Sequence, residues 1–163
     1  MIRSATVEDA AVLADIYNYY VTESVATFEE EPITAAEMRS RLEGVLEAGL
    51  PWFVAEDDGR IVGYAYAAKW NKRSAYRRTV EVTIYLANDV VAKGMGTRLY
   101  EKLFAQLRVK SYRIAIGGIT LPNPASVAIH EKFGMKKVGH FENVGLKQGQ
   151  WLDVGYWQVD LDD

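Results

Sequence analysis

The stretch VEVTIYLANDVVAKGMGTRLYEKLFAQL, residues 80–107, decides what kind of fold this chain adopts. Over residues 80–86 apolar side chains alternate with Glu81, Thr83 and Tyr85, which is the period of a β-strand. From position 99 leucines recur at every fourth residue, the spacing of one helix face. Gly94 and Gly96 lie between the two patterns. The stretch therefore predicts a strand, a glycine-containing loop and a helix in succession.

The flanking sequence extends this unit in both directions. A short first strand and a helix with apolar residues up to Tyr20 precede Thr34-Ala35-Ala36-Glu37, a capping box that predicts a second helix ending near Gly49. Strands are expected at 52–55 and 61–68, around a hairpin turn at 57–60. A buried strand at 114–119, a short helix at about 125–133 and strands at 138–141 and 154–159 follow. The prediction is an α/β fold in the order β-α-α-β-β-β-α-β-α-β-β, with a mixed central sheet and one domain over 1–163.

Composition excludes several classes of protein. The chain has 163 residues, a net charge of −3, no cysteine and two histidines. Disulfides, thiolate metal sites and thiol nucleophiles are therefore excluded, and no metal site is expected. The mild acidity offers no general field for nucleic acid, and neither a secretion signal nor a membrane span is evident. The expectation is a cytoplasmic protein without nucleic-acid or membrane partners.

The glycine loop has two interpretations when taken alone. A helix start exposes unpaired N–H groups and a partial positive charge, and glycines let an anion approach them closely. A Gly-x-Gly before a helix is also a common tight turn. The P-loop pattern is absent, and the third glycine of the dinucleotide fingerprint is replaced by Leu99.

The order of motifs along the chain resembles the GNAT N-acetyltransferases. Gly94-x-Gly96 between strand and helix is followed, after the next strand, by Asn123-Pro124-Ala125-Ser126 and by His130-Glu131-Lys132-Phe133-Gly134-Met135. The chain is similar to the phosphinothricin and methionine sulfoximine N-acetyltransferase branch in particular. The matching residues are Tyr17-Asn18, Thr27-Phe28, Glu31-Pro32, Gly63-Tyr64-Ala65, Tyr76-Arg77, Thr79-Val80-Glu81, Tyr85 and Gly145-x-Lys147-x-Gly149-x-Trp151-x-Asp153. The resemblance implies the GNAT (acyl-CoA N-acyltransferase) fold.

The resemblance also implies an activity. Acetyl-CoA would be the donor and the amine of a small amino acid-like molecule, such as phosphinothricin or methionine sulfoximine, the acceptor. Transfer would be direct, which agrees with the lack of cysteine. The alternatives are another acceptor amine (a polyamine, an aminoglycoside or a protein N-terminus) or a non-catalytic acetyl-CoA-binding regulatory module. The basic cluster Lys72, Arg73, Arg77 and Arg78 favours an anionic acceptor, and the family suggests a homodimer.

The cofactor-binding residues that the resemblance implies lie in three segments. The strand before the loop would offer backbone groups at Ile84, Tyr85 and Leu86, pairing with the pantetheine arm as an added strand. Asn123 would bond the same arm, or would only cap the next helix. Val91 stands where the family usually has Gln or Arg. The diphosphate cradle would be Ala92, Lys93, Gly94, Met95, Gly96 and Thr97.

The catalytic candidate is Glu81, which would take the proton of the acceptor ammonium. Burial beside Val80 and Val82 would raise its pKa toward the working range, whereas the alternative is an exposed carboxylate on a solvated strand face. His130 would protonate the leaving thiolate or be a packed histidine, and Phe28 would line the acceptor pocket or belong to the core. The predicted substrate-binding residues are Asn71, Lys72, Arg73, Glu81, Val82 and Thr83.

Overall fold

A computed structural model describes residues 1–90 and 94–162. The element order agrees with the order expected from the sequence, with two short 3-10 turns added at Val7–Asp9 and Ser74–Tyr76. The strands are β1 Ile2–Ser4, β2 Trp52–Asp57, β3 Arg60–Lys69, β4 Thr79–Leu86, β5 Ile114–Leu121, β6 Lys136–Lys147 and β7 Gln150–Asp160. The helices are α1 Ala10–Glu23, α2 Ala35–Glu47, α3 Met95–Val109 and α4 Pro124–Lys132.

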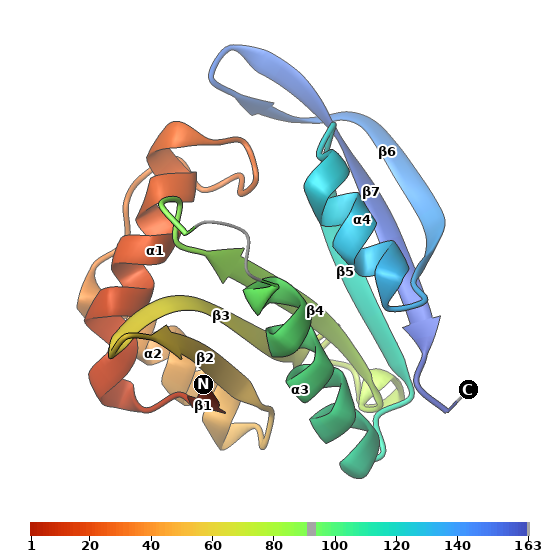
Figure 1. Cartoon of the computed structure of the whole chain (residues 1–163). Coiled ribbons are helices and arrows are strands. Elements are labelled where there is room, and N and C mark those ends of the chain that lie inside the picture. The colour runs from red at the N-terminus through yellow and green to blue at the C-terminus, as the bar shows by residue number, and fades with distance from the viewer. Residues whose placement is uncertain (91–93, 163) are drawn as a thin grey trace.

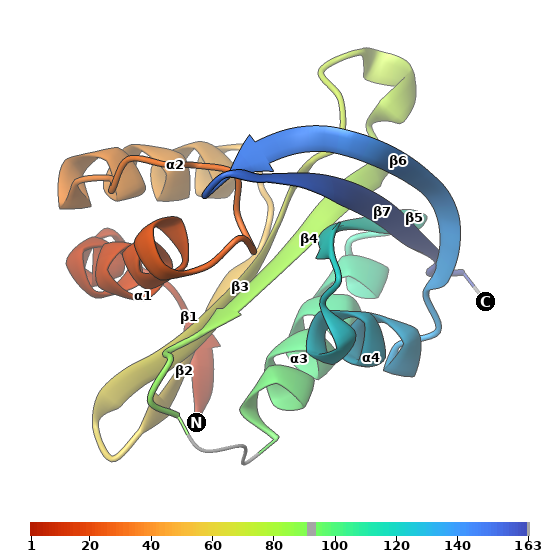
Figure 2. The same cartoon turned by 90° about the horizontal axis from the view of Figure 1, so that it is seen from above.

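The seven strands form one mixed sheet in the order β1-β2-β3-β4-β5-β7-β6. Every neighbouring pair is antiparallel except β4 and β5, which run parallel and are connected through α3. Figure 2 shows α1 and α2 on one side of β2–β4, with α3 and α4 on the other side of the sheet. The fold is therefore the helix-covered mixed sheet that the sequence predicts.

Each face of the sheet has its own apolar core. On the α3 face, fully buried leucines of that helix pack against Val80 and Val82 of β4. On the α1/α2 face, Leu13 and Leu42 pack against Trp52 of β2 and its neighbours. The alternation read from residues 80–86 therefore separates two cores, because successive side chains of β4 enter opposite faces.

Local signals mark the helix and hairpin boundaries where the sequence places them. The Thr34 hydroxyl accepts from the backbone N–H of Glu37 at 3.0 Å, which caps α2. Asp58 and Gly59 both have positive φ, as a two-residue hairpin turn between β2 and β3 requires. Gly134 has φ 83° directly after α4.

The last two strands are longer than predicted. The sequence pattern places them at 138–141 and 154–159, whereas β6 and β7 extend to a hairpin turn at Gln148 and Gly149. Register shifts between Lys137 and Gly139 and between Phe141 and Gly145 interrupt the alternation of β6. Much of β6 is also exposed, so no continuous apolar face marks its length.

Figure 1 shows the long β6–β7 hairpin reaching back over the end of α1. In the middle of the sheet, β4 and β5 separate along part of their length. They pair over Thr79–Glu81 and Ile114–Ile116, and the pairing does not continue through the remaining five residues of either strand. The sheet is therefore open between β4 and β5 beyond Glu81.

Candidate active site

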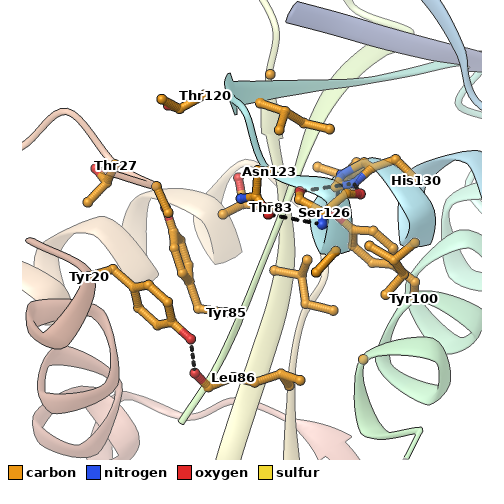
Figure 3. Close-up of a pocket in the computed structure, with 18 of the residues that line it drawn as sticks. Tyr20, Thr27, Thr83, Tyr85, Leu86, Tyr100, Thr120, Asn123, Ser126 and His130 are labelled. Carbon is orange, nitrogen blue, oxygen red and sulfur yellow. Dashed lines mark hydrogen bonds between the residues drawn. The ribbon is translucent and has the colours of Figure 1, made fainter. Parts of the chain in front are cut away.

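The opening between β4 and β5 contains the main cavity of this site, which has a volume of about 470 Å³. Its walls come from both strands, from the first turns of α3 and α4 and from the loop after α1, as Figure 3 shows for the labelled residues. The lining residues include Tyr20, Thr27, Glu81, Val82, Thr83, Ile84, Tyr85, Leu86, Gly96, Tyr100, Gly118, Thr120, Asn123, Ser126 and His130. The predicted catalytic and cofactor-binding segments thus meet at one place, although they are far apart in sequence.

The backbone of β4 presents hydrogen-bonding groups to this cavity. Pairing with β3 uses odd-numbered residues of β4, since Trp70 N–H donates to Thr79 and the register brings Tyr85 opposite Tyr64. Backbone groups alternate in direction along an antiparallel strand, so those of Ile84 and Leu86 point toward the opening and those of Tyr85 toward β3. The hydroxyl of Tyr20, which lies beside Tyr85, donates to the carbonyl of Leu86 (Figure 3).

The start of α3 forms the mouth of the cleft. Gly94 has φ 73°, a left-handed conformation that glycine adopts without strain. A Cβ atom on Gly96 would lie 3.1 Å from Ile129 Cδ1, so glycine allows α3 to pack against α4 here without displacing the Ile129 side chain. A second cavity of about 310 Å³ lies beside it, lined by Gly94, Met95, Gly96 and Thr97 among others. The predicted cradle residues Ala92 and Lys93, and the departure at Val91, lie outside the described residues.

Glu81 lies where β4 leaves β5, and its side chain is partly buried. Besides the main cavity it lines a groove of about 570 Å³, shared with Phe28, Val144 and Tyr156. Burial raises the pKa of the Glu81 carboxyl above its ordinary value. The interpretation as a fully exposed carboxylate is therefore wrong.

The source of that burial differs from the one expected. Val80 and Val82 belong to the core under α3, so the pleat directs them to the face opposite Glu81. The apolar groups that share the groove of Glu81 come instead from the loop after α1 and from β6 and β7. Sequence neighbours in a strand do not bury one another's side chains.

Asn123 acts as the cap of α4, which was one of the two interpretations. Its side-chain oxygen accepts from the backbone N–H of Ser126 at 3.2 Å. The same side chain lines the main cavity, as Figure 3 shows. Because the oxygen makes the cap, the amide NH₂ group is the part of Asn123 that a ligand in the cavity can use.

His130 is 4% exposed, and both of its ring nitrogens have hydrogen-bond partners. Its Nδ1 lies 2.7 Å from the carbonyl of Ser126, which only accepts, so Nδ1 carries the proton. Nε2 lies 3.0 Å from the hydroxyl of Tyr100. Since burial lowers the pKa of His130, the ring is neutral and Nε2 accepts from Tyr100. This geometry agrees with a packed histidine and leaves the ring without a free proton for a thiolate.

The predicted substrate residues divide into two groups. Val82 and Thr83 line the main cavity with Glu81. Asn71, Lys72 and Arg73 lie in the exposed loop between β3 and β4, and none of them lines the main cavity or the groove around Glu81. The Asn71 side chain accepts from the backbone N–H of Arg73 and shapes that loop. The structure of one chain therefore does not bring these three residues to Glu81.

Several lining residues were not identified from the sequence. Tyr100 follows Gly96 by four residues, and Ser126 precedes His130 by four, so helical spacing from residues already singled out would have indicated both. Tyr20 carries no comparable signal. Lys132, whose Nζ donates to the Thr97 hydroxyl at 3.3 Å, adds a positive charge at the helix mouth.

Within residues 1–90 and 94–162, no group of three or more His, Asp or Glu residues is placed to hold a metal ion. Likewise, none of the helices described is long and apolar enough to cross a membrane.

Comparison with known proteins gives one consistent result. The acetyltransferase (GNAT) domain pattern matches residues 2–155. A phosphinothricin N-acetyltransferase of Streptomyces viridochromogenes is 39% identical over 99% of this chain and 87% of its own length. An L-methionine sulfoximine/L-methionine sulfone acetyltransferase of Pseudomonas paraeruginosa is 32% identical over 99% of this chain and 94% of its own. Among solved structures, a phosphinothricin acetyltransferase of Sinorhizobium meliloti in complex with acetyl-CoA superimposes with a TM-score of 0.95, at 35% identity, covering 98% of this chain and 87% of that one.

Proposed function

Since the chain belongs to the GNAT family and is an acetyl-CoA-dependent N-acetyltransferase, we propose that it acetylates the amine of a small amino acid-like acceptor such as phosphinothricin or methionine sulfoximine. The names of its relatives support this acceptor class. The observation that carries the proposal is the opening of the sheet after Glu81. In this opening, the N-terminal turn of α3 and the partly buried carboxylate of Glu81 line the same cavity.

The donor side of the site would be built mainly from backbone. The free N–H groups at the start of α3, with Gly94, Met95, Gly96 and Thr97, would hold the diphosphate of acetyl-CoA, and Ala92 and Lys93 would complete the cradle. The groups of Ile84 and Leu86 that face the cleft would pair with the pantetheine arm. The amide NH₂ of Asn123 would reach the same arm from the opposite wall.

Glu81 would act as the base. The acceptor arrives as an ammonium and must lose one proton before its nitrogen attacks the thioester carbon. A carboxylate whose pKa is raised by burial holds that proton more readily than an exposed one. Attack would form the N–C bond and leave negative charge on the carbonyl oxygen, which a β4 N–H facing the cleft, such as that of Ile84, would stabilise. The C–S bond would then break, and the coenzyme A thiolate would take up, through solvent, a proton equivalent to the one that the new amide nitrogen loses.

The acceptor would lie in the groove around Glu81. Phe28 contributes to this groove from the loop after α1, and Val82 and Thr83 of β4 would contribute from the wall of the adjoining main cavity, which Glu81 also lines. The loop residues Asn71, Lys72 and Arg73, of which the lysine and the arginine are cationic, would select an anionic acceptor by moving toward this groove or by reaching the groove of a second copy. An acidic end group on the acceptor suits the guanidinium of Arg73.

We also propose that the chain forms a homodimer. Large apolar side chains that are exposed on the β6–β7 hairpin support this proposal. These side chains are Val138, Phe141, Val144, Leu146 and Trp151, each more than half exposed. Light scattering of the purified chain tests the dimer. We expect the protein to act in the cytoplasm.

A thiol-release assay tests the activity. Acetyl-CoA would be incubated with phosphinothricin, methionine sulfoximine, spermidine and kanamycin in parallel. Release of one equivalent of coenzyme A per acetylated phosphinothricin or methionine sulfoximine is the expected result. Activity on spermidine or kanamycin alone would reassign the acceptor, and tight acetyl-CoA binding without thiol release would indicate a regulatory module.

A further inference from the structure

Lys147 is a buried lysine at the tip of the β6–β7 hairpin. The residue is 3% exposed, and its Nζ donates to the carbonyl oxygens of Thr27 at 2.7 Å and Tyr20 at 3.3 Å. No ion pair joins it to a carboxylate in the part of the chain that the structure describes. Glu29 and Glu30 are the acidic groups that act on its charge, and burial lowers its pKa.

A buried ammonium needs compensation, because removal from water disfavours its charge. The two carbonyls supply it in different ways. Tyr20 lies in the last turn of α1, where carbonyls have no partner within the helix and the helix dipole favours a cation. Thr27 lies beyond that helix in the loop leading to α2. The Lys147 amine therefore connects the tip of the β6–β7 hairpin to the C-terminal end of α1 and to the loop that follows this helix.

The loop segment that Lys147 holds is a wall of the active site. Ala26 and Thr27 line the main cavity, and Phe28 lines the groove that contains Glu81. The Thr27 hydroxyl bonds to Tyr17 of α1 at 2.8 Å. The loop is therefore fixed by α1 on one side and by Lys147 on the other.

The hairpin fits the loop closely on the same side. Gly145 lies two residues before Lys147, and a Cβ atom at this position would collide with the ring of Phe28. The neighbouring Gln148 makes only a long bond, 3.4 Å, to the carbonyl of Thr22. Of these hairpin contacts, the 2.7 Å bond from Lys147 to the Thr27 carbonyl is the polar contact with the segment 26–28.

We infer that Lys147 is a positioning residue, which holds the segment 26–28 as the acceptor-side wall of the active site without touching the reacting atoms. The inference rests on the proposed function, since it assigns this wall to the acceptor. Loss of the amine would let the wall move away from Glu81. Acceptor binding would weaken, whereas the acetyl-CoA mouth at α3 would be unaffected.

The test compares three substitutions in the full chain. Lys147→Met keeps the length and apolar stem but removes the donor, and Lys147→Arg restores donors at the same position. Lys136→Met is the matched control, since Lys136 is an exposed lysine at the other end of the same strand. Steady-state kinetics would give the KM for acceptor and for acetyl-CoA, and hydrogen exchange would follow the backbone amides of residues 26–28.

We expect Lys147→Met to raise the acceptor KM tenfold or more, with the acetyl-CoA KM changed less than threefold. Amide exchange at residues 26–28 would be at least fivefold faster, Lys147→Arg would recover most of both effects, and Lys136→Met would match the unmodified chain. An unchanged acceptor KM, or equal changes in both KM values, would overturn the inference.

The exchange measurement separates two kinds of failure. If the unmodified chain acetylates no amine of the panel, the proposed function fails, and the inference for the acceptor wall fails with it. If the chain is active and Lys147→Met shows unaltered exchange at residues 26–28, the positioning role fails while the function stands. A folded state of Lys147→Met is checked by its melting curve.

Discussion

Replacing Glu81 by Gln removes the proposed base and almost nothing else, because the two side chains have the same shape. A positioned general base contributes roughly 10²–10⁴-fold to a rate. At about 1.4 kcal/mol per factor of ten, this corresponds to about 3–5 kcal/mol of transition-state stabilisation. We expect Glu81→Gln to lower kcat by this factor while the KM for acetyl-CoA changes little, since the diphosphate end of the site lies at α3.

Although Glu81→Gln lowers kcat, it is not expected to lower the stability of the folded chain. Burial raises the pKa of Glu81, so the folded chain binds this proton more tightly than the unfolded chain. The contribution of the group to stability is complete below its unfolded pKa and is lost as the pH rises through the folded pKa. Gln carries no charge, so Glu81→Gln is expected to melt at the same or a higher temperature at pH 8, and the advantage disappears in acid.

The assay follows thiol release from pH 6 to 9 with saturating acceptor, alongside melting curves in the same buffers. The unmodified chain should gain activity as Glu81 ionises, and this limb of the profile should disappear in Glu81→Gln. Glu47→Gln, on the exposed end of α2, controls for loss of a carboxylate in general. A kcat within threefold of the unmodified chain, with the acidic limb intact, would refute the role of Glu81 as base.

Three further substitutions test other parts of the structure. Gly96→Val would push against Ile129 and narrow the cleft mouth; we expect the acetyl-CoA KM to rise tenfold or more, and an unchanged value would contradict the placement of the cradle. Tyr100→Phe leaves the buried Nε2 of His130 without its donor, which should cost about 1–3 kcal/mol in urea unfolding; no loss would mean that the bond contributes nothing. Gly44→Ala places a methyl group in open space on α2 and should add about 0.5–1 kcal/mol of stability, measured as a higher Tm; a lower Tm would show that α2 is strained there.

The sequence predicts best those parts of the fold that depend on interactions between residues close together in the chain. The capping box at Thr34 and the turn at Asp58-Gly59 each act over a few residues, and both appear where expected. The alternation of β4 was equally informative because its two faces enter two different cores. In these segments local preference and tertiary packing favour the same structure.

The features that were missed depend on contacts distant in sequence. In the sequence, Lys147 matches the family pattern but has no predicted role, and the carbonyls that accept from its amine lie more than a hundred positions earlier in the chain. The partner of His130 is a tyrosine 30 residues away on another helix. The burial of Glu81 was anticipated but attributed to strand neighbours, because sequence gives no access to the groups that β6 and β7 bring across the sheet.

The short β4–β5 contact has a consequence for thermal behaviour. Three residues of β4 join the N-terminal four strands of the sheet to the C-terminal three, so a thioester arm lying in the gap would act as the strand missing from this seam. Binding to the folded chain alone then stabilises it through mass action, by about 2.7 kcal/mol at a hundredfold excess over Kd. The melting temperature should therefore rise with the logarithm of acetyl-CoA concentration, and the slowest-exchanging amides of β5 should gain the most protection.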